Sequence, residues 1–113
     1  MQIAEARVDG IVAVAPAGRI DTTTAPALEH YLIDLFTRGE RRIVIDFSGV
    51  EYISSAGLRV LLLVARRVRE MDGRLGLCAM GDTVRQVFQL AGFLPLFAVH
   101  ETRDAAVRQI AGP

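Results

Sequence analysis

The residues that could do chemistry gather in one short segment, residues 46–58, where a strand-like run gives way to a helical pattern. Two adjacent serines, Ser54 and Ser55, supply hydroxyl groups, and Ser55 is expected at or beside the N-cap of the helix. Unpaired amides and the positive end of the helix dipole favour negative charge at such a position. A hydroxyl there either caps the helix or accepts a phosphate, and its position alone is compatible with both roles.

Two small residues, Ala56 and Gly57, follow in the first expected turn of this helix. Their size leaves room for the active site of another protein to approach the Ser55 hydroxyl, and the glycine lowers helix propensity. We therefore assign Ala56 and Gly57, together with the two serines, to a predicted partner-binding surface.

The other potentially reactive side chains do not assemble into a recognisable site. His30 and His100 lie in different expected elements without ligands at metal-binding spacing, so we expect both on the surface. Cys78 is flanked by apolar residues in an expected strand, where a reduced cysteine packs as a small hydrophobe. Asp46 ends a buried strand, but a phospho-accepting receiver domain would also need an acidic cluster and a lysine. We expect no metal and no cofactor.

Composition narrows the possible functions. The chain has 113 residues, 51% of them hydrophobic, which suits a single domain over residues 1–113. Basic and acidic residues number 13 each, so no net charge attracts nucleic acid or an anionic membrane. Every basic residue is arginine, which excludes enzymes that depend on a catalytic or phosphate-binding lysine.

The expected location is the cytoplasm. The single cysteine cannot form an internal disulfide, and no charged-then-apolar leader precedes the first strand. The longest apolar run, Val60–Ala65, is far shorter than the roughly 20 residues that span a bilayer.

Hydrophobic periodicity predicts the elements that position the serines. Asp9 and Gly10 suit a tight hairpin turn, and Thr24, Asp82 and Thr102 are expected N-caps. The expected strands are residues 3–8, 11–17, 42–47, 75–79 and 96–99, and the expected helices follow Thr24, span residues 56–71, and follow Asp82 and Thr102. Residues 48–55 are expected to be a loop.

This order predicts an α/β fold, with an N-terminal β-hairpin followed by alternating strand–helix units. The sheet is expected to be mixed but mostly parallel, with four or five strands and about four helices. Partner chemistry in such folds gathers at the carboxyl ends of the strands, here near Gly18, Ser48 and Met80.

The serine segment resembles the signature of the anti-sigma factor antagonists, the STAS domain family. The resemblance rests on residues 46–50 (Asp-Phe-Ser-Gly-Val) and 53–58 (Ile-Ser-Ser-Ala-Gly-Leu). Residues 18–21 and 84–93 reinforce it, so that it covers nearly the whole chain.

This resemblance implies a non-enzymatic regulator that switches partners. It implies that an anti-sigma factor with a GHKL-type serine kinase fold phosphorylates Ser55 and that a serine phosphatase acts on the product. It places Asp21, and with it Thr22, in the loop facing that serine, where we expect both to bind the partner, and it makes Asp46 and Ser48 braces of the loop below Ser55. A monomer or weak homodimer is expected.

Two positions depart from the family pattern. Ser54 stands where the family usually has an aspartate, which makes it a possible second phosphate acceptor, and Ala56 stands where a serine is usual. Loss of the acidic neighbour could alter recognition by the kinase. Ser55 is still the favoured acceptor.

A second part of the predicted partner surface lies along the helix that follows Ser55. Arg59, Leu63, Arg66 and Glu70 recur at spacings of three and four on one stripe. An apolar leucine among charged residues indicates a contact, although single exposed leucines are common. We expect Arg59 and Leu63 to take part in docking.

Two other functions remain open. The chain could be the STAS subunit of a lipid-transporting ABC assembly, in which the same helix binds an ATPase. It could also be a serine hydrolase using Ser55, which would need a base, an orienting acid and an oxyanion site. The sequence lacks a Gly-x-Ser-x-Gly elbow and offers only two histidines, so hydrolysis is the weakest of the three hypotheses.

Overall fold

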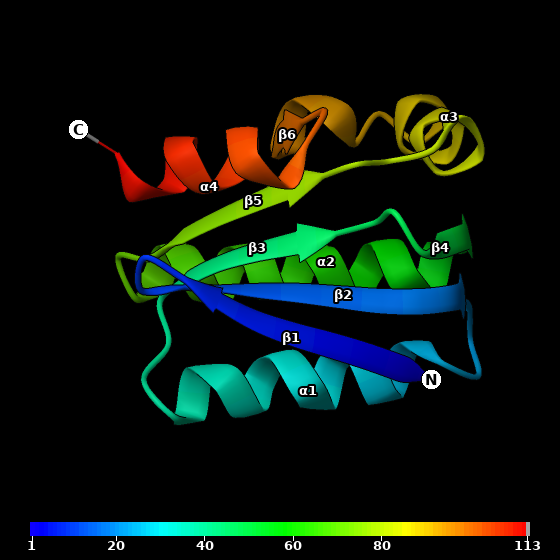
Figure 1. Ribbon diagram of the computed structural model, residues 1–113. Helices are drawn as coiled ribbons and strands as arrows, with labels where there is room; N and C mark the ends of the chain where they lie inside the picture. Colours follow the sequence, from blue (N-terminus) through cyan, green and yellow to red (C-terminus); the bar gives the residue numbers. More distant parts are fainter. Residues whose placement is uncertain (113) are drawn as a thin grey trace.

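The computed structural model describes residues 1–112 (Figure 1). It begins with an antiparallel hairpin of β1 (Gln2–Val8) and β2 (Ile11–Ile20). The turn places Asp9 and Gly10 at φ of 52° and 78°, and two successive positive values suit the twist of a two-residue hairpin. The predicted hairpin is confirmed, and β2 continues three residues past the expected end at Ala17.

The remaining elements alternate as expected, with one strand added. They are α1 (Ala25–Thr37), β3 (Arg42–Asp46), β4 (Val50–Ile53), α2 (Ser55–Glu70), β5 (Arg74–Cys78), α3 (Asp82–Leu90), a short 3₁₀ turn (Leu94–Leu96), β6 (Ala98–His100) and α4 (Arg103–Ala111). Within residues 1–112 the sheet has six strands and there are four α-helices.

The sheet is mixed, and its strands run in the order β1-β2-β3-β5-β6. Only the β1–β2 pair is antiparallel, while β2–β3, β3–β5 and β5–β6 are parallel. The added strand, β4, pairs in parallel with the far end of β2, beyond the stretch of β2 that pairs with β3. The α/β class and the mostly parallel sheet are confirmed.

The sequence analysis treated β4 as loop. This strand has four residues, and only its first and last, Val50 and Ile53, are buried. So short a pattern does not distinguish a strand from a turn. Its pairing depends on β2 having free backbone groups beyond β3.

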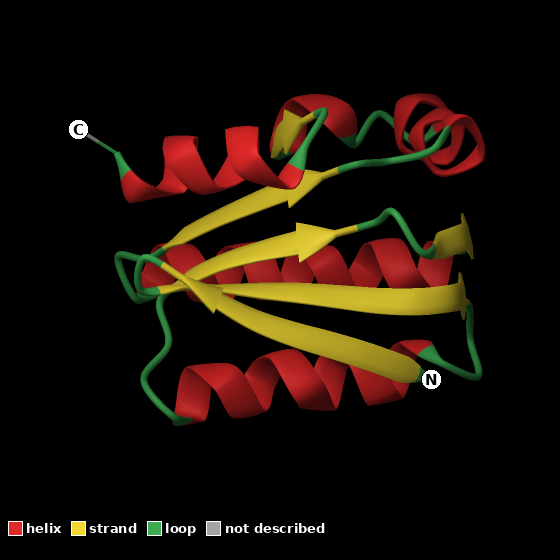
Figure 2. Ribbon diagram, in the orientation of Figure 1, coloured by secondary structure: helices red, strands yellow, loops and turns green. Residues whose placement is uncertain are grey.

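Helices cover both faces of the sheet (Figure 2). One core contains side chains of α1 and α2 packed on Val12, Val14 and Ile45. A second core joins α4 to the opposite face, where Ile110 and Ala106 pack with Val44 and Cys78. Cys78 is fully buried, as predicted. The last residues of β2 therefore extend past its pairing with β3, to the edge of the sheet where β4 and the start of α2 lie.

The predicted N-caps differ in outcome. Thr102 caps α4 as predicted, since its hydroxyl accepts a backbone amide of the helix at 3.1 Å. Thr24 precedes α1, but its hydroxyl donates to the Arg19 carbonyl at 2.7 Å and caps no helix amide. Asp82 is the first residue of α3, and Gly81 occupies the N-cap position. A polar residue before a helical pattern predicts where the helix begins more reliably than what its side chain binds.

No helix among residues 1–112 combines the length and the apolar character that crossing a lipid bilayer requires.

Candidate functional site

The pairing of β2 with β4 brings two separate segments of the chain together. Arg19 and Ile20 of β2 lie beside Tyr52 and Ile53 of β4, and the Ser54 amide donates to the Ile20 carbonyl at 2.8 Å. Both strands end at this point. The loop that starts at Asp21 and the beginning of α2 at Ser55 therefore lie side by side at one edge of the sheet.

Ser55 is the first residue of α2, and its side chain is exposed. Among residues 1–112 its hydroxyl forms no hydrogen bond. The first intrahelical bond at this end runs from the Leu58 amide to the Ser54 carbonyl at 3.0 Å, so the preceding amides of the helix have no acceptor within it. A phosphate on Ser55 would meet a locally positive field.

Ser54 lies at the N-cap with extended backbone, at φ −97° and ψ 176°. Its hydroxyl oxygen is buried and finds no hydrogen-bond partner among the described residues. This burial does not favour the prediction that Ser54 is a second phosphate acceptor, because a kinase would have to open the N-terminus of α2 to reach the oxygen.

Gly57 was predicted to lie on the partner surface, and its position in the fold does not favour that role. The residue is buried, and a Cβ atom built on it would lie 2.7 Å from side-chain carbons of both Ile20 and Ile53. Glycine is needed here because α2 starts in close contact with the two strands beneath it. Ala56 is half-buried and packs against the same core, so of the small residues only Ala56 reaches the surface.

Asp21 organises the neighbouring loop. Its Oδ1 accepts the amides of Thr23 and Thr24 at 3.0 and 3.2 Å, and these bonds close a turn before α1. The hydrogen bond from Thr24 is the main cause that holds the pKa of the Asp21 carboxyl below its ordinary value. Thr22 is exposed on the same loop. Asp21 is thus an ionised residue with a fixed orientation next to the Ser55 end of α2.

Arg19 is a part of this edge that the sequence analysis did not single out. Its guanidinium carbon lies 4.6 Å from the centre of the Tyr52 ring, and its Nε lies 3.7 Å from Asp21 Oδ2. The stacking couples β4 to the Asp21 loop. If residues 50–53 had been predicted as a strand beside β2, Arg19 and Tyr52 would have been expected on the same face of the sheet. The four-residue pattern is too short to predict that strand.

Asp46 and Ser48 brace the turn that leads from β3 into β4. Asp46 is 6% exposed, and its carboxylate accepts the Ser48 amide at 2.8 Å and the Arg103 Nε at 2.9 Å. Burial raises the pKa of Asp46, but the bonds from Ser48 and Arg103 outweigh burial and hold the pKa below its ordinary value. Through this bond Arg103 ties α4 to the turn. Neither Asp46 nor Ser48 has a hydrogen bond to Ser55 within residues 1–112.

The stripe predicted along α2 is exposed: Arg59, Leu63, Arg66 and Glu70 all face solvent. Leu63, the apolar member of the stripe, is 44% exposed. No residue of this stripe takes part in an ion pair with another residue among 1–112.

The histidines are not placed to activate Ser55. His30 is exposed on α1, whereas His100 is half-buried on β6, with an unpartnered buried Nε2. The expectation of a surface histidine at residue 100 is corrected. Three strand spacings separate β6 from β2 in the sheet, about 14 Å. The described residues do not bring a histidine base to Ser55, so the geometry does not favour a hydrolase.

Comparisons with known proteins agree on one family. The model of the STAS domain family matches residues 2–106. BtrV of Bordetella bronchiseptica, which is named as an anti-sigma factor antagonist, is 42% identical over 106 residues that cover 94% of this chain and 91% of BtrV.

Two solved structures extend the comparison. An anti-sigma factor antagonist from Mycobacterium paratuberculosis superposes with a TM-score of 0.88 at 30% identity, covering 96% of this chain and 92% of that one. SpoIIAA, called a Bacillus cell fate determinant, shares the fold in its unphosphorylated form, with a TM-score of 0.84 and 22% identity over 99% of this chain and 98% of SpoIIAA. It has also been solved in a phosphorylated form, with a TM-score of 0.74 and 21% identity over 96% of this chain and 99% of that chain.

The matched span includes the β2–β4 edge, the exposed serine that begins α2 and the helices that support them. The sequence match and the shared fold lead to the same assignment, and this chain belongs to the STAS domain family.

Proposed function

We propose that this chain is an anti-sigma factor antagonist controlled by phosphorylation of Ser55. In the unphosphorylated state it binds an anti-sigma factor that is a GHKL-type serine kinase. Phosphate on Ser55 releases it, and a serine phosphatase restores binding. As part of the same proposal, it acts in the cytoplasm, as a monomer or weak homodimer, and has no catalytic activity of its own.

One observation carries this proposal: of two adjacent serine hydroxyls at the start of α2, only that of Ser55 is exposed. An exposed hydroxyl without a hydrogen-bond partner is open to a kinase. The name of the 42% identical Bordetella relative supports the same function.

The chemistry of the edge accounts for the switch. The unmodified start of α2 is uncharged at Ser54, Ser55 and Ala56, so a partner can cover it with little desolvation penalty. A phosphate adds about 1.5 to 2 negative charges and three acceptor oxygens. Burying that charge beside the ionised Asp21 is unfavourable, and the complex dissociates.

The test uses the purified chain, ATP and the anti-sigma-type serine kinase encoded in the same genome. We expect phosphate on Ser55 by mass spectrometry, none on Ser55→Ala, and an unchanged amount on Ser54→Ala, the matched control one residue away. Ser55→Asp should bind the kinase at least about tenfold more weakly than the unmodified chain, ~1.4 kcal/mol. Phosphate on Ser54 alone, or tight binding of an ABC ATPase instead of the kinase, would contradict the proposal.

A further inference from the structure

Arg59 lies one helical turn after Ser55 on α2, and both residues are exposed. Residues four apart on a helix share one face, with Cβ atoms about 5–6 Å from each other. Long side chains in a helix lean towards its N-terminus, which is the direction of Ser55 from Arg59. A group attached to the Ser55 oxygen therefore comes within reach of the Arg59 guanidinium.

Arg59 has no anionic partner in the described part of the chain, where it takes part in no ion pair. The residues three and four positions away from it on either side are uncharged: Ser55, Ala56, Leu62 and Leu63. Of these four side chains, only the serine can gain a negative charge by phosphorylation. A phosphate on Ser55 would thus supply the anion that Arg59 lacks.

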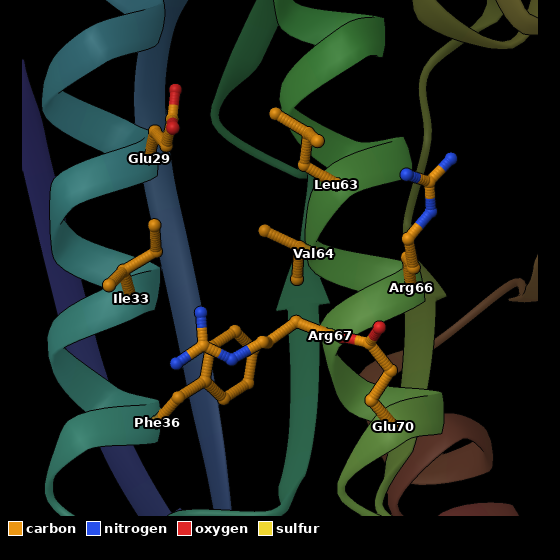
Figure 3. A pocket seen from close by; sticks show the side chains of 8 residues that line it. All are labelled: Glu29, Ile33, Phe36, Leu63, Val64, Arg66, Arg67 and Glu70. Carbon is orange, nitrogen blue, oxygen red and sulfur yellow. The ribbon is translucent and has the colours of Figure 1, made fainter.

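Two other arginines of α2 have carboxylates close by. Figure 3 shows Arg66 and Arg67 beside a hollow between α1 and α2 whose lining also includes Glu29 and Glu70. Glu70 follows these arginines by four and three residues, a spacing at which opposite charges attract on a helix. Arg66 also lies eleven residues after Ser55, about 16 Å along the helix axis, which is beyond the reach of its side chain.

Arg19 is the other arginine near the start of α2, and it is already engaged. Its guanidinium carbon lies 4.6 Å from the centre of the Tyr52 ring, and its Nε lies 3.7 Å from Asp21 Oδ2. The next side chain of β2, Ile20, is buried against the start of α2. Because side chains alternate along a strand, Arg19 is directed to the opposite face. Arg59 is therefore the better placed of the two.

We propose that the guanidinium of Arg59 binds the phosphate on Ser55, an inference that rests on the proposed function. Guanidinium and phosphate groups form paired, charge-assisted hydrogen bonds. The anion would precede the cation by four residues, which is the favourable order on a helix. The pair stabilises the phosphorylated chain while it is free. A partner that covers this end of α2 has to bury or break the pair, and this cost adds to the release caused by the phosphate.

The test uses the full chain with phosphoserine incorporated at position 55 during synthesis, so that it does not require the kinase. Phosphorus NMR measures the second pKa of the phosphate, which is about 6 in the absence of a bound cation. A guanidinium that binds the dianion lowers this pKa. Arg59→Gln should therefore raise it by about 0.3 or more, a twofold change in the ionisation constant. Arg59→Lys keeps the charge but loses the paired hydrogen bonds, so its pKa should lie between the two.

Arg66→Gln is the matched control, because it removes the same charge from the same exposed stripe at a distance where salt screens the attraction. Its phosphate pKa should differ from that of the unsubstituted chain by less than about 0.1. Arg19→Gln should change the pKa less than Arg59→Gln does. All three arginines are exposed, and circular dichroism establishes that each variant is folded. Equal values for Arg59→Gln and Arg66→Gln would overturn the inference, and a larger change for Arg19→Gln would assign the phosphate to Arg19.

Incubation of the serine form with the kinase and ATP separates this inference from the proposed function. If the kinase leaves Ser55 unmodified while Arg59→Gln still raises the pKa of the incorporated phosphoserine, the proposed function fails and the pairing stands. If the kinase phosphorylates Ser55 but Arg59→Gln leaves the pKa unchanged, the switch stands and the pairing is wrong.

Discussion

Two adjacent serines have opposite environments at the start of α2. The Ser54 amide still belongs to the strand pairing, through its bond to Ile20, and its hydroxyl is turned inward. Ser55 is already helical and exposed. One peptide bond thus separates a buried hydroxyl from an accessible one, and this difference favours Ser55 over Ser54 as the proposed phosphate acceptor.

The environment of Ser54 predicts a stability effect opposite to the usual one. Replacing an N-cap serine by alanine normally destabilises a protein by about 0.5–2 kcal/mol, because a capping hydrogen bond is lost. The Ser54 hydroxyl makes no such bond and is buried without a partner, a state that costs about 1–3 kcal/mol. We expect Ser54→Ala to leave the free energy of unfolding unchanged or to raise it, as measured by urea denaturation.

Thr102→Ala is the matched control for this prediction. The Thr102 side chain caps α4, so Thr102→Ala should lower the free energy of unfolding by about 1 kcal/mol. A comparable loss in Ser54→Ala would mean that the Ser54 side chain caps α2 in solution.

Among the elements, β4 decides where the site forms. It places Tyr52 next to Arg19 and delivers Ser55 beside the Asp21 loop. The turn before β4 is held by Asp46, which is itself held by Arg103 from α4. A helix on the opposite face of the sheet therefore supports the strand that presents the serine.

This support should depend on pH. The pKa of Asp46 is lower in the folded than in the unfolded chain. Its contribution to the free energy of unfolding is therefore complete above the unfolded pKa of about 3.9. That contribution is lost as the pH falls through the lower pKa of the folded chain. We expect Asp46→Asn to lower the free energy of unfolding at pH 7 by about 1–3 kcal/mol. The difference between the two proteins should shrink below about pH 4.

Urea denaturation between pH 3 and 7 measures this difference. Asp104→Asn, which changes an exposed carboxylate near the start of the same helix, should lower the free energy of unfolding at pH 7 by less than Asp46→Asn does, because this side chain leaves no buried partner unpaired. An Asp46→Asn profile parallel to that of the unmodified chain at every pH would show that the ion pair does not stabilise the fold.

At the scale of the whole molecule, helices pack on both faces of the sheet. Cys78 lies in the core beneath α4, together with Val44 and Ile110. Burial is the main cause that raises the pKa of the Cys78 thiol to about 11. At pH 8 about one thiol in a thousand is therefore ionised, and reagents cannot reach it.

Reactivity of Cys78 should consequently report unfolding of the whole domain. We expect native protein at pH 8 to resist a thiol-specific disulfide reagent for hours and to react fully above the midpoint of urea unfolding. The measurement is the labelling rate against urea concentration. Fast labelling in the absence of urea would mean that α4 opens independently of the rest of the domain.

Much of this architecture follows from local patterns. Hydrophobic periods of two and 3.6 depend on neighbours within a few residues, and they correctly indicated the hairpin, all four helices and, apart from β4, the parallel strands. Asp9 and Gly10 specified the first turn, since few other residues adopt its backbone angles. Residues 46–50 and 53–58, reinforced by residues 18–21 and 84–93, indicated the family, because that resemblance rests on residue types alone.

The features that local patterns did not predict depend on packing between segments that are distant in the sequence. Asp46 and Arg103 are 57 residues apart, and the Gly57 contact involves Ile20 on another strand, so no local pattern contains either. The strand β4 exists because β2 extends past β3, and a hollow between α1 and α2 brings Ile33 and Leu63 of two separate segments into one lining. Which serine faces solvent belongs to this second group, since the direction of a side chain is set by what its backbone is bonded to across the sheet.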